Sequence, residues 1–395
     1  MNKLLYISTG LPTKEVELLR KKQYDFSSNA ILPLSTFHGN ILSGLAENYD
    51  EIVALSGVPI SHRNFKVLRY SGKTIQSGKI QYVIPGFFNL PGIKQLTTVI
   101  KFFPHILRWC RKNKNENCHI VIDGCFYTGL LPLWAASKFT SAKLGAIIVD
   151  YYDFMDPSCT AFKQKLYYKM LSCIDRFVFV TDHLDKLVNK LQKPSMIMEG
   201  LVAPVPVPDV DPAVDNYCMY AGGLHEIYGV KNLVDAFHQT ELPYSLHLYG
   251  NGDTVDYIQE VGRKDPRIVY KGIVSHDQLL EIERSAKLLI NPRPVYGKLD
   301  TRFNFPSKLM EFMQSGRPVI TTRLLGIPKE YENYMYFFES DTTQQIKADI
   351  ERVLSQNESD LICFAHAARE YVNENKNSLA AGKRIFSLMN AHGGT

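Results

Sequence analysis

The stretch 302–319 constrains the fold most, because it predicts a short helix with defined ends between two strands. Asn304 can cap a helix, and Pro306 suits a first helical turn, where its missing N–H would be unpaired anyway. Gly316 is a typical helix terminator. We therefore predict a helix over residues 306–315, within an alternation of strands and helices that indicates an α/β protein.

The first turn of this helix is suited to holding a phosphate. Ser307 and Lys308 lie there, so free backbone N–H groups, a hydroxyl and an ammonium point to one place. Glu311 follows on the same face, where its carboxylate can accept hydrogen bonds from a ribose diol. Alternatively, Lys308 and Glu311 are simply a solvated pair on an otherwise buried helix. Strand ends on both sides favour a nucleotide-diphosphate site, since open α/β sheets bind ligands there.

Four segments in this part of the chain carry a family resemblance: 305–308, 311–313, 316–319 and 326–331. They resemble the C-terminal domain of the retaining glycosyltransferases of family 4, and more narrowly the branch that builds bacterial capsular, exopolysaccharide and O-antigen repeats. The resemblance implies the GT-B fold, in which two Rossmann-like domains face each other across a cleft. It also implies a C-terminal helix that crosses back to the first domain.

Composition supports two ordinary globular domains. The chain has 395 residues, of which 45% are hydrophobic and 22% charged, enough for two separate cores. A net charge of +5 gives no indication of a nucleic-acid binder. Seven cysteines without a Cys-x-x-Cys pair favour reduced thiols in a cytoplasm. We find no apolar run long enough for a signal peptide or a membrane span, and expect a cytoplasmic protein.

A proline-rich segment divides the chain. We predict an N-terminal acceptor-binding domain over 1–203, a linker over 204–212 and a nucleotide-sugar-binding domain over 213–362. The resemblance alone assigns 363–395 to helices that return to the first domain. Asp209 and Asp211, within the linker, match an acid-x-acid metal motif, but the flanking prolines favour linker chemistry and we expect no metal site.

In the first domain, two positions are candidates for contact with the sugar or the acceptor. Gly10 follows the first predicted strand, and the resemblance implies that this loop lines the cleft. Predicted strands over 119–124 and 144–150 each end near an aspartate at the carboxyl edge of the sheet. The second of these, Asp150, is the candidate for the sugar or acceptor hydroxyl, with a helix cap or a turn as the alternative.

In the second domain, glycines at strand ends would let a nucleotide approach the backbone closely. The resemblance places Gly250, Gly252 and the backbone near Gly272 in the nucleobase pocket. The expected donor-binding residues are Ser307, Glu311, Asn304, Phe305, Gly250, Gly252, Gly272, Gly222 and Gly223.

The chain departs from the family pattern in three places. Gly223 and Tyr228 stand where typical members carry the arginine and lysine that neutralise the diphosphate. Phe303 stands where they carry the first of two glutamates, which holds the sugar hydroxyls. Arg293 and Lys308 are the expected catalytic substitutes, because a guanidinium fork and an ammonium can together balance a leaving diphosphate.

Residues 87–114 form a basic amphipathic region. Packing of its apolar residues against the sheet is the commoner explanation. Contact with the inner face of a membrane is the alternative, since enzymes similar to this one often take lipid-linked acceptors.

The resemblance implies an enzyme that transfers a hexose, with retention and without a metal or other cofactor, from a nucleoside diphosphate to an acceptor. UDP is favoured over GDP, and the acceptor is expected to be a glycan or a polyprenyl-diphosphate-linked glycan in surface polysaccharide assembly. Positive groups would stabilise charge on the departing phosphate. A nucleotide-sugar epimerase of the same fold and a non-catalytic scaffold subunit are the alternatives.

Overall fold

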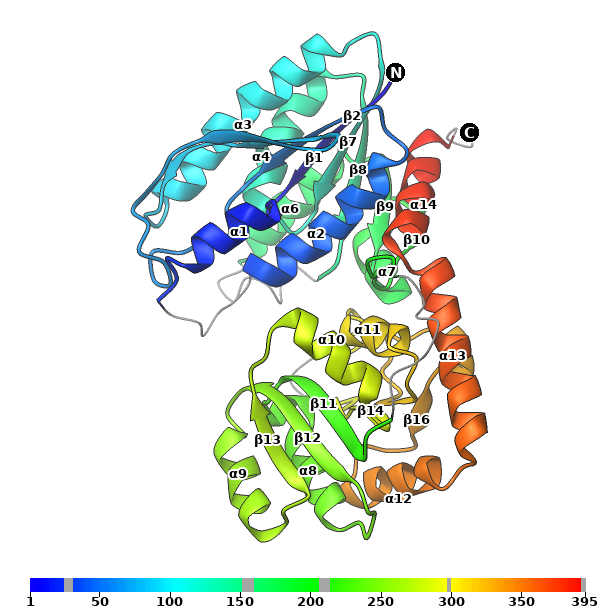
Figure 1. Ribbon diagram of the computed structural model, residues 1–395. Helices are drawn as coiled ribbons and strands as arrows, with labels where there is room; N and C mark the ends of the chain where they lie inside the picture. The colour runs from blue at the N-terminus through cyan, green and yellow to red at the C-terminus, as the bar shows by residue number, and fades with distance from the viewer. Residues whose placement is uncertain (25–30, 151–159, 206–213, 297–299, 392–395) are drawn as a thin grey trace. The chain divides into compact units, whose positions relative to one another are not determined.

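The computed structural model describes residues 1–24, 31–150, 160–205, 214–296 and 300–391. The chain divides into two compact units (Figure 1): unit 1 comprises Met1–Ala203 and Ser378–Thr395, and unit 2 comprises Pro204–Asn377. Most of the predicted linker, with Asp209 and Asp211, lies outside the described residues.

Unit 1 is built on an eight-stranded sheet of order β10-β9-β8-β7-β1-β2-β5-β4, parallel except for the β4–β5 pair. β1 is apolar on both faces because helices cover both, and its residues 4–7 are all buried. A separate antiparallel pair joins β3 and β6. The strands are β1 Asn2–Ser8, β2 Glu51–Ser56, β3 Arg69–Tyr70, β4 Lys73–Ser77, β5 Ile80–Ile84, β6 Phe87–Phe88, β7 Asn117–Asp123, β8 Lys143–Ile148, β9 Arg176–Phe179 and β10 Ser195–Ile197.

Helices α2 and α14 pack together on one side of this sheet, and α3 and α4 pack together on the other (Figure 1). The helices of unit 1 are α1 Thr13–Arg20, α2 Ile31–Ala46, α3 Ile93–Lys112, α4 Tyr127–Ala136, α6 Ala161–Leu171, α7 Asp182–Val188 and α14 Ser378–Asn390, with a 3₁₀ turn, η1, at Ser137–Phe139.

The α2–α14 contact is a close approach of two backbones. A Cβ on Gly44 would lie 1.7 Å from the carbonyl oxygen of Ser378, and one on Gly382 would lie 2.2 Å from the carbonyl oxygen of Gly44. Only glycine fits at either position. Ser378 N–H also donates to the carbonyl of Val202 at 2.9 Å, which attaches the start of α14 to the end of the first stretch of unit 1.

The return to unit 1 begins later than the sequence analysis placed it. α13, Glu358–Asn375, belongs to unit 2, where it packs against α11 and buries Leu361, Ala365 and Val372. The crossover therefore occurs at Ser378 rather than at residue 363, because the apolar stripe of α13 has its partner in unit 2.

The two halves of helix α3, which forms most of the basic amphipathic region, differ in burial. Phe102, Ile106 and Trp109 are buried, as expected for packing on the sheet. Leu96 and Ile100, nearer its beginning, are each 60% exposed. The predicted packing thus holds for the second half of the helix and leaves an apolar face open on the first.

Unit 2 contains a six-stranded parallel sheet of order β13-β12-β11-β14-β15-β16. The order reverses between β11 and β14, which creates the crevice where doubly wound folds bind ligands. The strands are β11 Tyr217–Gly223, β12 Ser245–Asn251, β13 Ile268–Gly272, β14 Leu288–Asn291, β15 Val319–Thr322 and β16 Tyr336–Phe338. The helices are α8 Val230–His238, α9 Val255–Lys264, α10 His276–Ser285, α11 Lys308–Gln314, α12 Thr343–Leu354 and α13, with 3₁₀ turns η2 Glu226–Tyr228 and η3 Lys329–Asn333.

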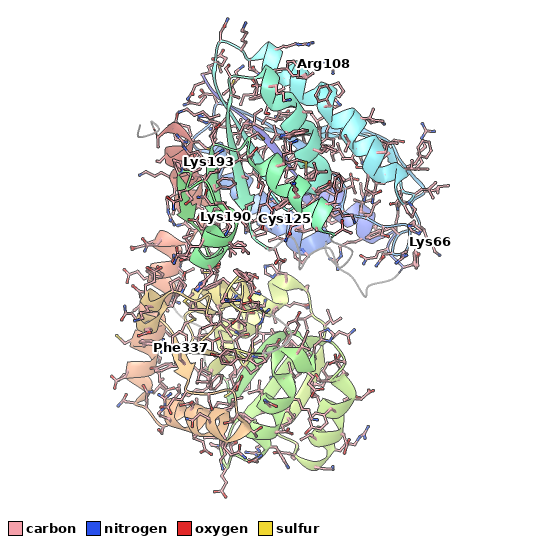
Figure 2. All side chains as sticks on the ribbon, turned by 180° about the vertical axis from the view of Figure 1, so that it is seen from behind. Lys66, Arg108, Cys125, Lys190, Lys193 and Phe337 are labelled. Carbon is pink, nitrogen blue, oxygen red and sulfur yellow. The ribbon has the colours of Figure 1, made fainter. Side chains whose placement is uncertain are left out.

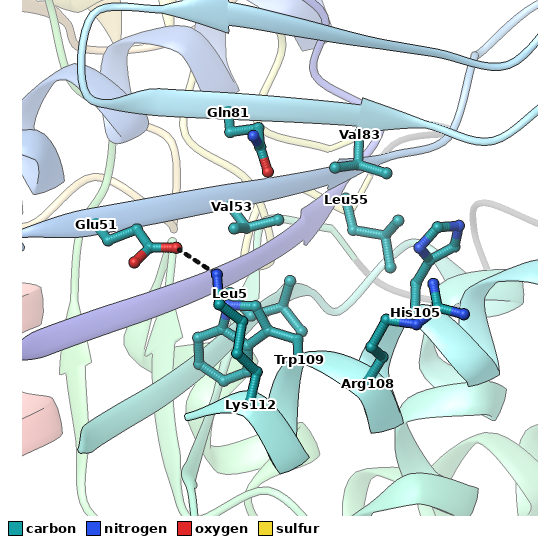
Figure 3. A pocket seen from close by; sticks show the side chains of 10 residues that line it. All are labelled: Leu5, Glu51, Val53, Leu55, Gln81, Val83, His105, Arg108, Trp109 and Lys112. Carbon is teal, nitrogen blue, oxygen red and sulfur yellow. Dashed lines mark ion pairs between the residues drawn. The ribbon is translucent and has the colours of Figure 1, made fainter. Parts of the chain in front are cut away.

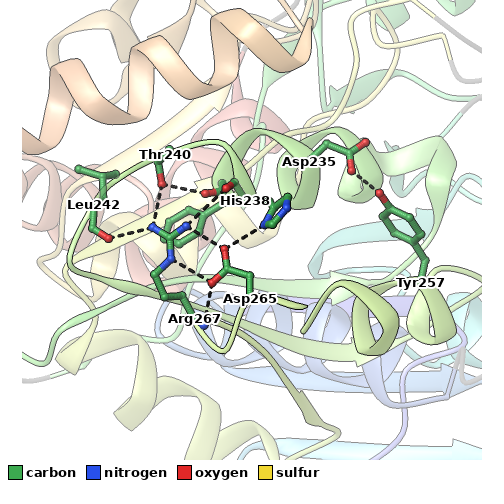
Figure 4. A network of polar contacts seen from close by, with 8 residues as sticks. Asp235, His238, Thr240, Leu242, Tyr257, Asp265 and Arg267 are labelled. Carbon is green, nitrogen blue, oxygen red and sulfur yellow. Dashed lines mark hydrogen bonds and ion pairs between the residues drawn. The ribbon is translucent and has the colours of Figure 1, made fainter. Parts of the chain in front are cut away.

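A polar network fastens the amino edge of this sheet. Asp265 accepts hydrogen bonds from Arg267 Nε at 3.0 Å and Nη2 at 2.8 Å, and lies 3.0 Å from His238 Nδ1 (Figure 4). Arg267 also donates to the carbonyl of Leu242 at 3.0 Å. The hydrogen bonds from Arg267 hold the pKa of Asp265 well below its usual range. The network joins the end of α8 to the start of β13, opposite the ligand-binding edge, and is structural.

Candidate functional site

The candidate site lies in unit 2 at the carboxyl ends of β11 and β14, which are neighbours in the sheet. The chain leaves β11 at Gly223 and reaches η2, and it leaves β14 at Asn291 and reaches Arg293 two residues later. These two loops flank the point where the strand order reverses.

Arg293 places a positive charge over the loop that follows β11. Its guanidinium carbon is 5.5 Å from the ring centroid of Tyr228, a cation–π distance, and the side chain is half-buried. Burial raises the pKa of Tyr220, and the charge of Arg293 acts on that phenol in the opposite direction. Arg293 therefore lies beside the position where the family resemblance expects a lysine and this chain has Tyr228.

Lys308 sits between two carboxylates. Its Nζ donates to Glu311 Oε2 at 2.6 Å and lies 3.4 Å from Glu283 Oε1. The side chains of Lys308 and Glu311 are 26% and 28% exposed, whereas that of Glu283 is completely buried. The alternative of a Lys308–Glu311 pair is thus seen, but the pair is half-buried and shared with a third charge, rather than solvated.

The environment shifts the protonation of this cluster. Burial raises the pKa of Glu283 to about 7, with Glu311 acting in the same direction and Lys308 against it. For Lys308, burial acts to lower the pKa, but attraction to Glu283 and Glu311 outweighs it and the pKa is raised. The lysine is a fixed cation, and Glu283 is the group that can change charge near neutral pH.

Glu283 was missed by the sequence analysis. It lies on α10, four residues after Leu279 and three before Ala286, on the face of the helix that packs inward. That spacing was the available signal, because an acid at an apolar helical position is unusual and needs a partner.

The predicted cap of α11 is wrong. Asn304 does not cap the helix; its Nδ2 donates to the carbonyl of Asp300 at a long 3.5 Å. α11 runs over Lys308–Gln314, with Ser307 at the N-cap position making no side-chain cap bond. Pro306 and Ser307 accept bonds from residues three further on, so the chain enters through a tighter turn and the regular helix is shorter than predicted.

The other residues around α11 have local partners. Phe305 is buried, with its ring centroid 5.4 Å from that of Tyr331. Asp300, the acid nearest to the missing first glutamate, forms an ion pair with Arg302 at 2.7 Å. Phe303, at the position of that glutamate, is half-buried. No described residue of the 300–305 segment presents an unpaired carboxylate in its place.

The strand-end glycines lie where the sequence placed them. Gly222 and Gly223 end β11, and Gly250 lies beside Gly222 in β12. Gly250 has φ +132°, and a Cβ there would be 1.9 Å from the carbonyl oxygen of Gly222. A Cβ on Gly252 would likewise be 2.0 Å from the carbonyl oxygen of Leu224. Close packing of the two strand ends thus accounts for the glycines at 250 and 252 without any ligand.

Gly272 ends β13 with φ +72°, and a Cβ there would meet nothing within 4 Å. Its surroundings are open, in contrast to the packing around Gly250. Of the three positions expected near the nucleobase, this is the one with space beside it.

In unit 1, Gly10 and Asp150 follow β1 and β8, on the carboxyl edge of that sheet. Gly10 N–H donates to Ser8 Oγ at 3.0 Å. Asp150 is half-buried, and its carbonyl oxygen is 3.8 Å from the thiol of Cys125, which is labelled in Figure 2.

The other strand-end aspartate, Asp123, is turned inward. It lies 3.2 Å from His38 Nε2 and accepts the N–H of Cys125 at 2.9 Å. Tyr6 forms the next link, its hydroxyl lying 2.8 Å from His38 Nδ1. Tyr6, His38 and Asp123 are all buried, whereas Cys125 is partly exposed, so Asp123 organises the end of β7.

A cavity of about 160 Å³ in unit 1 is separate from these positions (Figure 3). It lies between the middle of the strands and α3, with Leu5 and Val53 among its apolar walls and Arg108 at its border. Lys112 Nζ and Glu51 Oε1, also at the border, are 3.9 Å apart. Because it opens on the face of the sheet and not at the carboxyl edge, it is not the expected nucleotide site.

Comparison with known proteins identifies the chemistry of unit 2. Residues 215–356 match the family model described as Glycosyl transferases group 1. The chain is a glycosyltransferase. A search of curated protein sequences finds no match.

Solved structures show that this glycosyltransferase has the GT-B fold predicted from the sequence. Sucrose-phosphate synthase from Thermosynechococcus elongatus superposes with a TM-score of 0.67 at 13% identity, over 98% of each chain. HepE from Anabaena, in complex with UDP, gives 0.62 at 14% identity, over 98% of each chain. A trehalose-6-phosphate synthase, studied for glycosyl transfer with retention, gives 0.64 at 10% identity, over 99% of this chain and 100% of that one.

Proposed function

We propose that this glycosyltransferase is a retaining hexosyltransferase of family 4 that uses a UDP-sugar, with GDP as the second choice, and needs no metal ion. The observation that carries the proposal is the position of Arg293 over Tyr228. This chain lacks the two cations of the first loop of the domain, and Arg293 supplies one from the neighbouring loop. A diphosphate at the strand-order reversal would meet it there.

Lys308 provides the second positive charge. Its ammonium is held at 2.6 Å by Glu311, so a phosphate oxygen would replace that carboxylate as its partner. Glu311 would then be released to accept the hydroxyls of the ribose, which a carboxylate can do with both oxygens. This exchange explains how a paired lysine can serve a donor that is not yet bound.

Transfer would proceed by departure of the diphosphate as positive charge develops on the sugar. Arg293 and Lys308 would stabilise the charge that grows on the leaving phosphate, as oxyanion donors do elsewhere. A phosphate oxygen of the donor can accept the proton of the incoming hydroxyl, so no separate base is required. Retention is supported by the trehalose-6-phosphate synthase likeness, and UDP by the HepE complex, as analogies of fold.

We propose a glycan or polyprenyl-diphosphate-linked glycan as acceptor, in surface polysaccharide assembly on the cytoplasmic face of a membrane. Residues 52–115 carry eleven Lys and Arg and no Asp or Glu. Lys66 and Arg108, labelled in Figure 2, belong to this segment. Leu96 and Ile100 of α3 expose an apolar face within it. A basic surface with an apolar face favours contact with an anionic bilayer. Among the described residues, no helix is long and apolar enough to span one.

The proposal is tested by incubating the protein with a panel of nucleotide sugars in the presence of a chelator and following donor consumption by mass spectrometry. We expect one donor to be consumed, and Lys308→Ala and Glu311→Ala to lose most of that activity. Activity that survives both substitutions would place the site elsewhere. Consumption that stops with the chelator would refute the metal-free mechanism.

Two alternatives give different outcomes in the same assay. An epimerase would leave the mass of the donor unchanged and release no free UDP, and chromatographic separation before mass spectrometry would resolve the epimer that it forms without an acceptor. A scaffold subunit, which the missing first glutamate suggests, would bind a nucleotide and consume no donor with any acceptor.

A further inference from the structure

Glu283 is a buried acid that has an ion pair with Lys308 but no well-formed hydrogen bond within the described part of the chain. Its side chain is completely buried, and neither carboxyl oxygen accepts a well-formed hydrogen bond from the residues that the structure describes. The ion pair to Lys308 at 3.4 Å is longer than the 2.6 Å bond that joins Lys308 to Glu311. The ammonium of Lys308 is therefore shared between two carboxylates and lies closer to that of Glu311 than to that of Glu283.

The charge balance of this cluster opposes the ligand proposed for it. When both glutamates are ionised, the three side chains carry a net charge of −1, and a diphosphate would add at least two more negative charges. When Glu283 is protonated, the cluster is neutral and Lys308 can exchange Glu311 for phosphate. Burial prevents water from screening the repulsion between Glu283 and the incoming phosphate.

We propose that Glu283 is a positioning residue that takes up a proton when a nucleoside diphosphate binds at Lys308. In the free protein the ionised carboxyl helps to hold the lysine, and in the complex the protonated carboxyl removes the opposing charge. The inference rests on the proposed function, because it requires the diphosphate to reach Lys308.

The surroundings of Glu283 support the exchange. The charged groups that act on it are Lys308 and Glu311 from α11 and Arg284 on its own helix. Its pKa of about 7 in the free protein means that both protonation states are accessible near neutral pH. A phosphate beside it adds negative charge and moves this pKa further upward.

The test is calorimetric titration of the full chain with UDP at pH 8, in two buffers of different ionisation enthalpy, for wild type, Glu283→Gln and Glu281→Gln. Glu281 is an exposed acid on the same helix and is the matched control. From a pKa of about 7, wild type and the control should take up about 0.9 proton per UDP, and Glu283→Gln close to none. The terminal phosphate of UDP titrates near pH 6 and does not contribute at pH 8.

The same variant should gain affinity. At pH 8 the neutral glutamine avoids the protonation step, so Glu283→Gln should bind UDP about tenfold more tightly than wild type, falling to about twofold at pH 7. A residue with only a structural role would weaken binding or leave it unchanged at both pH values. Thermal unfolding of each variant shows whether it is folded.

Three results would overturn the inference. Equal proton uptake by wild type and Glu283→Gln is one, and a variant that binds no more tightly at pH 8 is the second. If Glu283→Gln does not fold, wild type alone decides, because UDP binding without uptake at pH 8 refutes the coupling while leaving the proposed function intact. If wild type binds neither UDP nor GDP, the proposed function fails first and the inference fails with it.

Discussion

Replacing Arg293 tests whether its guanidinium balances the charge of the leaving diphosphate. In Arg293→Ala the guanidinium 5.5 Å from the ring of Tyr228 is removed, and with it the cation that we propose the loop after β14 supplies to the diphosphate. The loss of one preorganised donor to a developing anion costs about 2.7 to 4 kcal/mol of barrier. At about 1.36 kcal/mol per factor of ten, kcat/KM should fall about 100- to 1000-fold.

The fold should survive this substitution. The cation–π contact that is lost contributes on the order of 0.5 to 1 kcal/mol at a partly exposed site. That is small beside the roughly 5 to 15 kcal/mol by which domains are stable. Thermal unfolding should therefore shift little, and the loss in kcat/KM can be attributed to the charge. Arg263→Ala, which removes an exposed arginine of α9, is the matched control and should leave kcat/KM unchanged.

A second substitution should restore part of the activity. Tyr228→Lys puts a cation at the position where the resemblance expects one, beside the space that Arg293→Ala leaves. The double variant Arg293→Ala/Tyr228→Lys should recover at least about tenfold of the lost kcat/KM, measured as steady-state transfer with the identified donor. If Arg293→Ala keeps full activity, or if the added lysine gives no recovery in a folded protein, Arg293 does not balance the diphosphate.

Two further predictions concern the surface of unit 1 and the stability of unit 2. Leu96→Asp/Ile100→Asp should abolish co-sedimentation with anionic vesicles. The control Leu18→Asp, at an exposed leucine of α1, should not. Equal vesicle binding by both variants would show that α3 does not contact the membrane. Asp265→Asn should lower the free energy of unfolding at pH 7 by about 1.5 to 3 kcal/mol, because Arg267 loses a charged partner. Since the pKa of Asp265 lies below its ordinary 3.8 in the folded protein, this contribution is complete above that pH and is lost below it, so urea titrations of wild type and variant should converge as pH falls below about 4.

The helices and strands could be predicted from the sequence where a single local feature determines them. Strand 319–322 lies where the sequence placed it, and the helix before it ends within one residue of its predicted end, because apolar strands and glycine helix ends are local features. The cap by Asn304 failed because the preceding chain competes for its side chain, which bonds to Asp300 instead. The crossover at Ser378 could not be located, since α13 and α14 have similar apolar stripes and only tertiary contacts tell which unit each covers.

In the candidate site, too, contacts within one helix could be predicted, whereas contacts between helices could not. The pairing of Lys308 with Glu311 follows from their spacing on a helix and could therefore be predicted from the sequence. The third member, Glu283, comes from a helix 25 residues earlier, and only the packing of α10 brings it to the lysine. The glycines at 250 and 252 were attributed to ligand approach, whereas the backbones of Gly222 and Leu224 already exclude a side chain there.

The glycine contact between α2 and α14 affects the order in which the protein can be assembled during synthesis. Unit 2 is one continuous stretch, but unit 1 needs α14, which the ribosome makes after unit 2. Until then the surface of α2 at Gly44 is uncovered, and Ala381, Ile385 and Met389 of α14 are not yet available to fill the core beside it. Unit 1 therefore stays incomplete on the nascent chain, exposed to chaperones and proteases, until its last helix has been made.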